Sequence, residues 1–314
     1  MIKILGVDIG GTDIKLGIVS AGGEILESGS IPTIAREGPG QAAARVAKWL
    51  GDLHDGHGEI AAAGIDCAGL IDGSRGHLYF SPNLPGWKDL ELGELFSGEL
   101  GLPVTVDNDV NCAAWGEYIL GAGRGTRHFV CMTLGTGIGG GIIADGRLYR
   151  GWQGMAGEIG HQVIDPSGPK CACGSTGCLE AMANASSIVS RVLGAIGAGG
   201  RSILTGSEEP TAKDVADAAD KGDAVAIAAL ADAGRALGVG LANVVHLFNP
   251  EVIAVGGGVA GAGELILDPA RDSMRDHLMD DILASVNIVQ AELGNMASLV
   301  GASMMALGLI ETKR

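Results

Sequence analysis

Two similar segments, at residues 6–19 and 132–143, each run from an apolar strand through a glycine turn into a second strand. A third apolar run, at 252–255, also ends in glycines. Continuous apolar runs rich in β-branched residues predict buried strands. A strand, turn and strand that occur twice restrict the fold strongly. They indicate two similar halves of the protein, which would face one ligand bound between them. We therefore expect two α/β domains that share a cleft.

The length of the chain agrees with two domains. Its 314 residues exceed one typical domain and are too few for three. We expect a small α/β domain over residues 1–108, a larger one over 109–296, and an apolar C-terminal helix over 297–314 that packs back on the first domain. The predicted elements are helices over 41–53, 110–120 and much of 186–247, and strands over 2–9, 14–19, 60–65, 103–106, 129–134 and 141–144.

The composition excludes several kinds of partner. The formal net charge of −16 repels polyanions, and no local Lys/Arg cluster offsets it, so nucleic acid is not an expected partner. The 54 glycines interrupt the apolar runs before any reaches the roughly 18 residues of a membrane helix. The first residues lack the apolar stretch and cleavage site of a signal peptide, so we expect no membrane association and a cytoplasmic location.

The first glycine turn has the composition of a phosphate-binding hairpin. Asp8 ends a predicted strand and is followed by Gly10, Gly11 and Thr12, with Lys15 three residues further on. Glycines let backbone N–H groups approach phosphate oxygens, and the Thr12 hydroxyl adds a donor. Asp8 is then placed to hold Mg²⁺ through water. The alternative is a hairpin turn without a ligand.

The second glycine-rich stretch, residues 134–141, repeats this device with Thr136 and Gly137 in its turn. Neither stretch is a Walker loop or a dinucleotide fingerprint. Phosphate binding by hairpins is the arrangement of the hexokinase and actin class of ATPases. The expected fold is therefore an α/β, two-domain actin/hexokinase-like (ribonuclease H-like) ATPase fold with an interdomain cleft.

The sequence Val-Asp-Asn-Asp at 106–109 ends a predicted strand just before a predicted helix, which directs the Asp109 carboxylate into the cleft. Phosphoryl transfer requires little covalent chemistry from the protein, so one carboxylate in line with the γ-phosphate, together with Mg²⁺, is sufficient. The alternative is an ordinary helix N-cap.

One histidine and three cysteines lie close together in the sequence: His161, Cys171, Cys173 and Cys178. Crowded cysteines in a reducing compartment indicate a metal more than a disulfide. Four such ligands complete a closed tetrahedral zinc site, which leaves no position open for water and makes the zinc structural. The alternative is a chance cluster of free thiols.

Two carboxylates, Glu158 and Glu180, flank this cluster in the sequence, so the zinc would hold both beside one pocket. Carboxylates suit sugar hydroxyls, and the second ring nitrogen of His161 is then free to contact a sugar. In the first half, the loop over 81–87 is braced by prolines and holds Asn83 toward a polar ligand, unless it is an ordinary surface loop.

From residue 4 to about 308, these motifs resemble, in their order, those of the ROK family of sugar kinases and repressors. The resemblance implies ATP and Mg²⁺ as cofactors, a structural Zn²⁺, and an adenosine-side loop at Gly256, Gly257 and Gly258. It also implies a shell of residues around a hexose: Gly69, Asn83, Asn108, Asp109, Glu158, His161 and Glu180. Ala68 departs from the family pattern, as do Ser187 and residues 295–298, which leaves the sugar preference and the nucleotide affinity open.

The activity that the resemblance implies is ATP-dependent phosphorylation of a hexose by a homodimer, with Asp109 as general base and glucose as the first choice of substrate. N-acetylmannosamine, N-acetylglucosamine, fructose and allose stay open. The family's repressors carry a winged-helix domain before the first hairpin, for which a hairpin that starts at Asp8 leaves no room. A non-catalytic sugar sensor would not need Asp109, and a chaperone or cytoskeletal ATPase would not need the zinc segment.

Overall fold

The structure is a computed structural model that describes the chain except for residues 1, 54–58, 280–281, 283–284 and 312–314. Its first sheet has five strands in the order β3-β2-β1-β4-β8. Their bounds are Lys3–Ile9 (β1), Asp13–Ser20 (β2), Ile25–Pro32 (β3), Ile60–Cys67 (β4) and Val104–Asn108 (β8). Strand residues alternate between faces. Accordingly, Leu5 and Val7 face a core shared with α1 (Pro39–Asp52) and α2 (Leu92–Leu100), and Ile4 packs on α10 (Ala297–Glu311).

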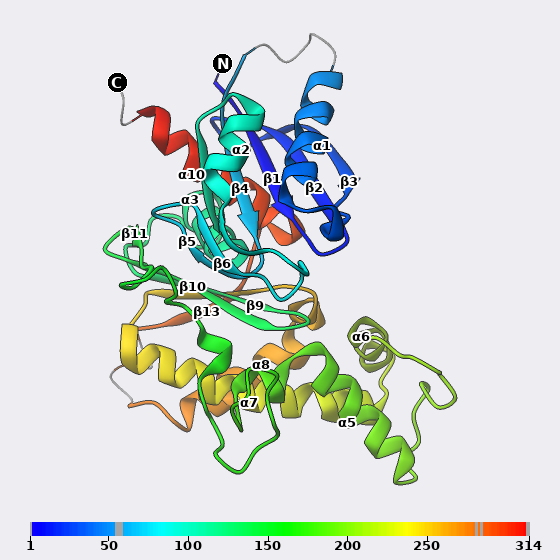
Figure 1. The fold of residues 1–314 in the computed structure, drawn as a ribbon. Helices are drawn as coiled ribbons and strands as arrows, with labels where there is room; N and C mark the ends of the chain where they lie inside the picture. Colours follow the sequence, from blue (N-terminus) through cyan, green and yellow to red (C-terminus); the bar gives the residue numbers. More distant parts are fainter. Residues whose placement is uncertain (1, 54–58, 280–281, 283–284, 312–314) are drawn as a thin grey trace.

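The second sheet also has five strands, in the order β11-β10-β9-β12-β13. Their bounds are Phe129–Leu134 (β9), Ile138–Ala144 (β10), Arg147–Leu148 (β11), Val252–Gly256 (β12) and Asn287–Gln290 (β13). Val130 and Met132 face the largest core, under α7 (Ala224–Phe248) and α8 (Glu264–Arg275), and Phe129 faces α3 (Asp109–Leu120). Figure 1 shows the two sheets one above the other, with α7 and α8 at the far side of the second.

The two sheets share one topology. Each contains three antiparallel strands in sequence order, and the first of these strands is joined on its other side by two parallel strands. The α/β prediction and the prediction of two similar halves are confirmed.

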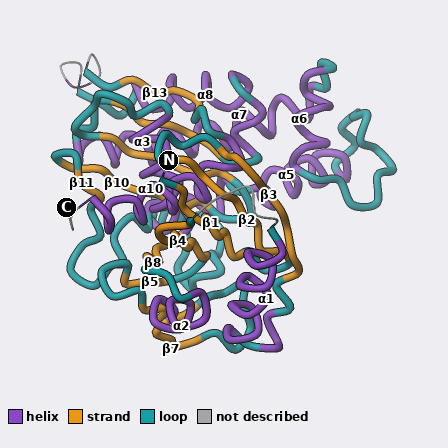
Figure 2. The backbone as a smooth tube through the Cα atoms, turned by 90° about the horizontal axis from the view of Figure 1, so that it is seen from above, coloured by secondary structure: helices purple, strands orange, loops and turns teal. Residues whose placement is uncertain are grey.

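Several smaller elements complete the described fold. They are β5 (Leu70–Asp72), β6 (His77–Phe80), β7 (Lys88–Glu91), η1 (Ala35–Glu37), η2 (Ile159–His161), α4 (Leu179–Ala183), α5 (Ala185–Gly197), α6 (Ala212–Asp220), η3 (Val259–Ala262) and η4 (Gly294–Met296). Strands β5, β6 and β7 form a small antiparallel sheet that the sequence analysis did not predict. Figure 2 shows α5 and α6 at one end of the molecule, with a long loop beyond them.

Two sequence expectations need correction. The second turn covers only residues 135–137, because β10 already begins at Ile138 and its glycines are strand residues. They permit close packing: a β-carbon at Gly139 would overlap the Val110 side chain, and one at Gly141 would overlap Ala114. In addition, α7 is long and apolar enough to cross a membrane by length and composition alone. Slightly more than half of its apolar window, 56%, is buried inside the protein, where it forms the centre of the largest core.

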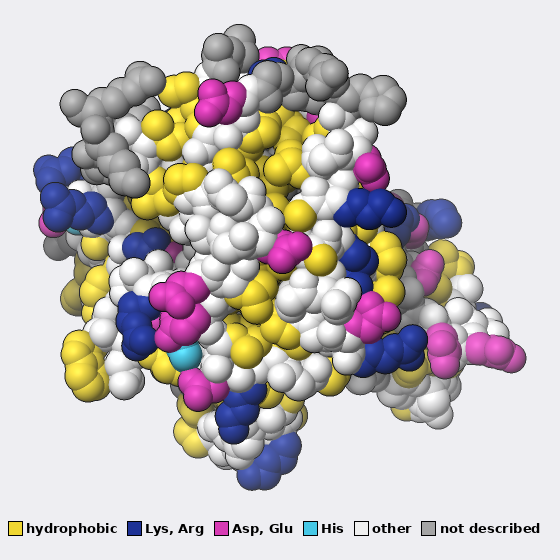
Figure 3. Space-filling model, turned by 45° about the horizontal axis from the view of Figure 1, so that its top comes forward, with side chains coloured by type: hydrophobic (Ala, Val, Ile, Leu, Met, Phe, Trp, Pro, Cys, Tyr) yellow, Lys and Arg dark blue, Asp and Glu magenta, His cyan; other side chains and the backbone are white. Residues whose placement is uncertain are grey.

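Lys and Arg side chains are dispersed on the face of the molecule drawn in Figure 3. There they lie scattered among acidic, apolar and neutral side chains and form no single basic area among the described residues.

Helices α3 and α10 pack against each other through glycines. A β-carbon at Gly301 on α10 would overlap the Cys112 carbonyl of α3, and one at Gly116 would lie 2.6 Å from the Ala297 carbonyl oxygen. The contact is therefore backbone to backbone. It places α3, which leads out of the first sheet, against the second sheet as well.

Replacing Gly301 by Ala should destabilise the protein, because the new methyl group overlaps backbone atoms that cannot move aside. We expect the free energy of unfolding to fall by about 1–3 kcal/mol. Gly308→Ala in the same helix is the matched control: an added β-carbon there would meet no atom of another element within 4 Å and should stabilise by about 0.4–1 kcal/mol. Denaturant unfolding measures both, and equal behaviour of the two variants would contradict the packing described here.

Candidate active site

A cavity of about 950 Å³ lies between the two halves. The first half contributes residues from the β4–β5 junction, the loop after β6 and the start of α3, and the second half contributes the β9–β10 hairpin and the segment through η2. The predicted site residues that line it are Gly69, Asn83, Asn108, Asp109, Thr136, Gly137, Glu158, His161, Cys173, Glu180 and Gly257. The structure thus brings all seven residues of the predicted hexose shell around one cavity.

Asp109 occupies the junction between this cavity and a smaller one. The smaller cavity, about 290 Å³, is lined by Asp109 together with Asp8, Lys15 and Gly256. The pKa of Asp109 is raised to about 6, mainly by burial and also by the negative charges of Asp8 and Glu158, against the opposing backbone hydrogen bond at Val110. A carboxylate with this pKa is ionised at neutral pH and can accept a proton.

Asn108 lines the cavity, and its side chain also has a role in the local fold. Its side-chain oxygen caps α3 by accepting the N–H groups of Val110 (2.9 Å) and Asn111 (3.2 Å), and its amide nitrogen donates to the Gly69 carbonyl at 3.0 Å. The N-cap considered for Asp109 is therefore Asn108. With the cap supplied by its neighbour, the Asp109 carboxylate need not cap the helix.

The first glycine hairpin is held at the edge of the cleft. Gly10 closes the turn by donating to the Asp13 carbonyl at 3.0 Å, and the buried Thr33 hydroxyl donates to the Gly10 carbonyl at 2.7 Å. Gly11 approaches the Asn83 loop so closely that a β-carbon would lie 3.1 Å from the Asn83 carbonyl oxygen. Gly11 and Thr12 are exposed, so their N–H groups are accessible to a ligand.

An ion pair lies behind this turn. Lys15 Nζ is 2.9 Å from Asp8 Oδ2, the two residues facing each other across the β1–β2 hairpin. Burial works to lower the pKa of Lys15, but the hydrogen bond and charge of Asp8 outweigh it and raise that pKa. Asp8 thus has a cation beside it, and both residues line the smaller cavity.

Glu180 connects the second hairpin with the cysteine cluster. One carboxylate oxygen accepts the Ile138 N–H at 3.0 Å, and the other lies 3.7 Å from Cys171 Sγ and 4.0 Å from His161 Nδ1. Ala185 N–H donates to the Gly135 carbonyl at 2.9 Å and further fixes this turn. One oxygen of Glu180 thus already has a backbone partner.

The four predicted metal ligands come together. The Nδ1 atom of His161 and the Sγ atoms of Cys171, Cys173 and Cys178 all lie within 4.8 Å of one another. The Cys173 to Cys178 and Cys171 to His161 separations are both 3.7 Å. Two thiolates on one tetrahedral zinc ion, each about 2.3 Å from it, are roughly 3.7 Å apart. The cluster is therefore compatible with zinc.

The orientation of His161 agrees with this ligand set. Nδ1 faces the sulfur atoms, while Nε2 is turned toward Glu158, whose carboxylate lies 3.8 Å away. Burial raises the pKa of the Cys171 thiol to about 12, so thiolate formation there needs a cation. The remaining cysteines, Cys67, Cys112 and Cys131, are buried, as predicted.

Residues 256–258 end β12 at the rear of the cleft. Gly256 and Gly257 line the smaller cavity, and Gly257 lines the larger one as well. A β-carbon at Gly258 would meet no atom within 4 Å, so this residue borders open space.

Sequence reasoning missed two acidic residues beside the site. Asp66 in β4 is fully buried, and both its carboxylate oxygens lack a hydrogen-bond partner among the described residues. Burial, and then the charges of Asp8 and Asp109, raise its pKa well above the usual range, which favours the protonated form. Asp107, 2% exposed, pairs with Arg150 from the other half. An acid inside the otherwise apolar run at 60–67 was the available signal for Asp66.

Comparisons with known proteins agree on one family. The chain matches the ROK family over residues 4–308. It is 40% identical over 316 residues to a glucokinase from Streptomyces coelicolor, with 96% of each chain covered. It is also similar to the solved structure of a ROK family glucokinase from Streptomyces griseus in complex with glucose and AMPPNP, at 38% identity and a TM-score of 0.82, covering 98% of this chain and 99% of that one.

A further solved structure, a ROK family transcriptional regulator described as a homolog of the E. coli MLC protein, is 28% identical with a TM-score of 0.92, over 98% of this chain and 78% of that chain. The likeness to these structures confirms the predicted actin/hexokinase-like fold. The fold does not separate kinase from regulator, so the function must be argued from the site.

Zinc content tests the cysteine cluster directly. The wild-type protein should hold about one zinc per chain, and Cys173→Ser should lower that content several-fold and reduce thermal stability, because metal binding contributes to folding. Ser175→Ala in the same exposed loop is the control and should keep its zinc. Metal analysis and calorimetry measure both; a Cys173→Ser protein with full zinc would refute this ligand set.

Proposed function

The chain belongs to the ROK family, and from that premise we propose that it is an ATP-dependent hexokinase of the glucokinase type, which converts D-glucose to glucose 6-phosphate. The observation that carries the proposal is the position of Asp109. It is the only predicted site residue that lines both the large cavity and the small cavity beside Asp8 and Lys15, apart from the backbone at Gly257. A base there stands between an acceptor on one side and a phosphate donor on the other.

The large cavity is the acceptor side. Asn83 and Asn108 line it from the first half, and Glu158, His161 and Glu180 line it from the second. Carboxylates, amides and an imidazole nitrogen give hydrogen-bond acceptors and donors that match vicinal hydroxyls. Gly69 adds its backbone. We assign these residues to the hexose.

The glycine hairpins are the donor side. Gly11 and Thr12 are exposed at one edge and Thr136 at the other, while Gly10 and Gly137 are half-buried in the same turns. Asp8 is placed to orient Mg²⁺ through water, which would neutralise charge on the transferring phosphoryl group. Glycines 256–258 receive the adenosine. The role of the protein is then to align donor, acceptor and Asp109, which takes the proton of the sugar 6-hydroxyl.

The His161, Cys171, Cys173 and Cys178 cluster holds a structural zinc in this proposal. A four-ligand site has no open position for water, so the ion takes no part in the phosphoryl transfer. It fixes His161 with Nε2 toward Glu158, and the neighbouring Glu180 with it. The segment that carries these sugar-facing residues has little regular secondary structure. The zinc would therefore keep them in position.

Further parts of the proposal rest on the family. The enzyme would work in the cytoplasm as a homodimer, with a small domain over 1–108, a large domain over 109–296 and the 297–314 helix packed on the small domain. N-acetylmannosamine, N-acetylglucosamine, fructose and allose are the alternative acceptors. A non-catalytic sugar sensor is the second candidate, because the fold is shared with a transcriptional regulator at a TM-score of 0.92; such a protein would bind sugar without needing Asp109.

Replacing Asp109 by Asn should remove the base while the size of the side chain is kept. We expect kcat to fall by about 10²–10⁴-fold, the range for loss of a general base. Sugar binding, followed by tryptophan fluorescence, should change little. Asp52→Asn, at the exposed end of α1, is the control and should keep wild-type turnover. Near-normal turnover of Asp109→Asn would remove Asp109 from the mechanism.

The pH dependence of kcat/KM should report the pKa of Asp109. Because that pKa is raised to about 6, protonation of the base increases as the pH falls through 6. The protonated acid cannot accept the hydroxyl proton, so kcat/KM at pH 5 should be about tenfold below its plateau above pH 7. Steady-state rates across this range measure the profile. A flat profile between pH 7.5 and 5 would contradict the assignment.

A further inference from the structure

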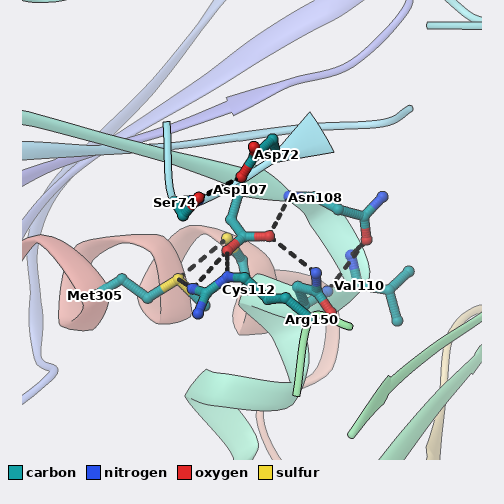
Figure 4. A network of polar contacts seen from close by, with 9 residues as sticks. Asp72, Ser74, Asp107, Asn108, Val110, Cys112, Arg150 and Met305 are labelled. Carbon is teal, nitrogen blue, oxygen red and sulfur yellow. Dashed lines mark hydrogen bonds and ion pairs between the residues drawn. The ribbon is translucent and has the colours of Figure 1, made fainter. Parts of the chain in front are cut away.

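A buried ion pair connects the two halves beside the cleft. Asp107, on β8 of the first sheet, is 2% exposed, and Arg150 lies just after β11 of the second sheet. Both Nε and Nη2 of Arg150 are 2.7 Å from Asp107 Oδ2. Figure 4 shows the guanidinium directed at the end of this carboxylate. The pair is therefore geometrically well formed and shielded from water on the Asp107 side.

The other oxygen of Asp107 organises the residues around Asp109. Oδ1 accepts the backbone N–H of Asn108 at 2.8 Å and the side-chain amide of Asn111 at 2.9 Å. Asn108 precedes Asp109 and caps its helix, and Asn111 follows in the first turn. One carboxylate thus joins an arginine of the second half to the start of α3.

The backbone next to Arg150 is seated on the first half as well. A β-carbon at Gly154 would lie 2.8 Å from both the Asp72 Cα and the Ile71 carbonyl oxygen of β5. Across the ion pair, a β-carbon at Gly73 would lie 2.9 Å from Arg150 Nε. The guanidinium also lies near α10, with Nη2 4.0 Å from Met305 Sδ. The Arg150 side chain thus lies against residue 73 and α10 in addition to Asp107.

The sugar-facing residues of the second half have an anchor of their own apart from this ion pair. Ile159, between Glu158 and His161, is buried in the large core against β10, and its η2 turn is anchored there. Loss of Arg150 would therefore disturb the start of α3 more than the position of Glu158.

We propose that Arg150 is a positioning residue for Asp109, acting across the cleft through Asp107. This inference rests on the proposed kinase function. Phosphoryl transfer requires the base to be aligned within a fraction of an ångström, and a residue remote from the chemistry can control that alignment. The orientation of Asp109 then depends on contact between the two halves. The competing view is that Arg150 only neutralises a buried carboxylate and so contributes to stability.

Four variants separate these views. Arg150→Met removes the ion pair, Arg150→Lys keeps the charge with a single nitrogen, and the double variant Asp107→Asn/Arg150→Met removes the buried charge together with its partner. Arg75→Met is the matched control, because Arg75 pairs with Glu91 at 3.1 Å on the exposed surface. Wild-type turnover of hexoses is measured first, since it tests the proposed function independently of Arg150.

Arg150→Met should lower kcat by about tenfold to hundredfold while the sugar KM changes less than about threefold. Arg150→Lys should be intermediate in kcat, and Arg75→Met should equal the wild type. The double variant should regain the thermal stability lost in Arg150→Met yet keep its low kcat. Recovery of kcat together with stability in the double variant, or an unchanged kcat in Arg150→Met, would overturn the proposal.

Hydrogen exchange tests the role of Arg150 without any measurement of catalytic turnover. Hydrogen exchange of the backbone amides at 108–112 should be faster in Arg150→Met than in the wild type and in Arg75→Met. If exchange rises only around residue 150, Arg150 does not order the start of α3 and the proposal is wrong. If the wild type phosphorylates no hexose, the kinase assignment fails, while the exchange data still decide whether Arg150 orders the residues around Asp109.

Discussion

The whole site depends on the direct passage from β8 into α3. The strand ends at Asn108 and the helix begins at Asp109. Because no loop separates them, the position of the Asp109 carboxylate is fixed by regular structure on both sides. Asn108 makes this possible by capping the helix with its oxygen and binding the Gly69 carbonyl with its nitrogen. In a sheet of parallel strands, ligands bind at the carboxyl ends of the strands. Asp109 is thereby placed at the cleft, and it is partly desolvated by the same packing that raises its pKa.

Close packing of backbones holds the two halves in register around this point. Helix α3 leaves the first sheet and packs against the second, and it touches α10 backbone to backbone where Gly116 and Gly301 meet the opposite helix. The glycines of β10 likewise permit close packing, because they have no side chain to separate α3 from the strand. Glycines in this chain therefore allow helices and strands to pack closely, in addition to allowing tight turns. The buried pair of Asp107 and Arg150 adds a polar connection between the halves.

Local sequence predicted those features whose residues are close in the chain. The two hairpins, the strand before Asp109 and the His/Cys cluster each lie within a short segment with a recognisable chemistry. The ion pair between Asp107 and Arg150 was not predictable, because nothing local indicates which of many arginines meets a buried acid 43 residues away. The strand β7 was missed because Lys88–Glu91 is mostly charged and exposed, without the alternation that indicates a sheet. The turn at 135–137 was placed too broadly because glycines needed for packing look like glycines needed for turning.

The function proposed for this cleft is transfer of the γ-phosphoryl group of ATP to a hexose hydroxyl. Its most direct test is ATP consumption by the zinc-loaded protein with Mg²⁺ across a panel of hexoses and N-acetylhexosamines, with the phosphorylated position read by NMR. We expect sugar-dependent consumption, fastest with glucose, and phosphate on the 6-hydroxyl. Consumption with another sugar would correct the substrate and keep the mechanism. No sugar-dependent consumption across the panel would contradict the claim and favour a sugar-binding protein without catalysis.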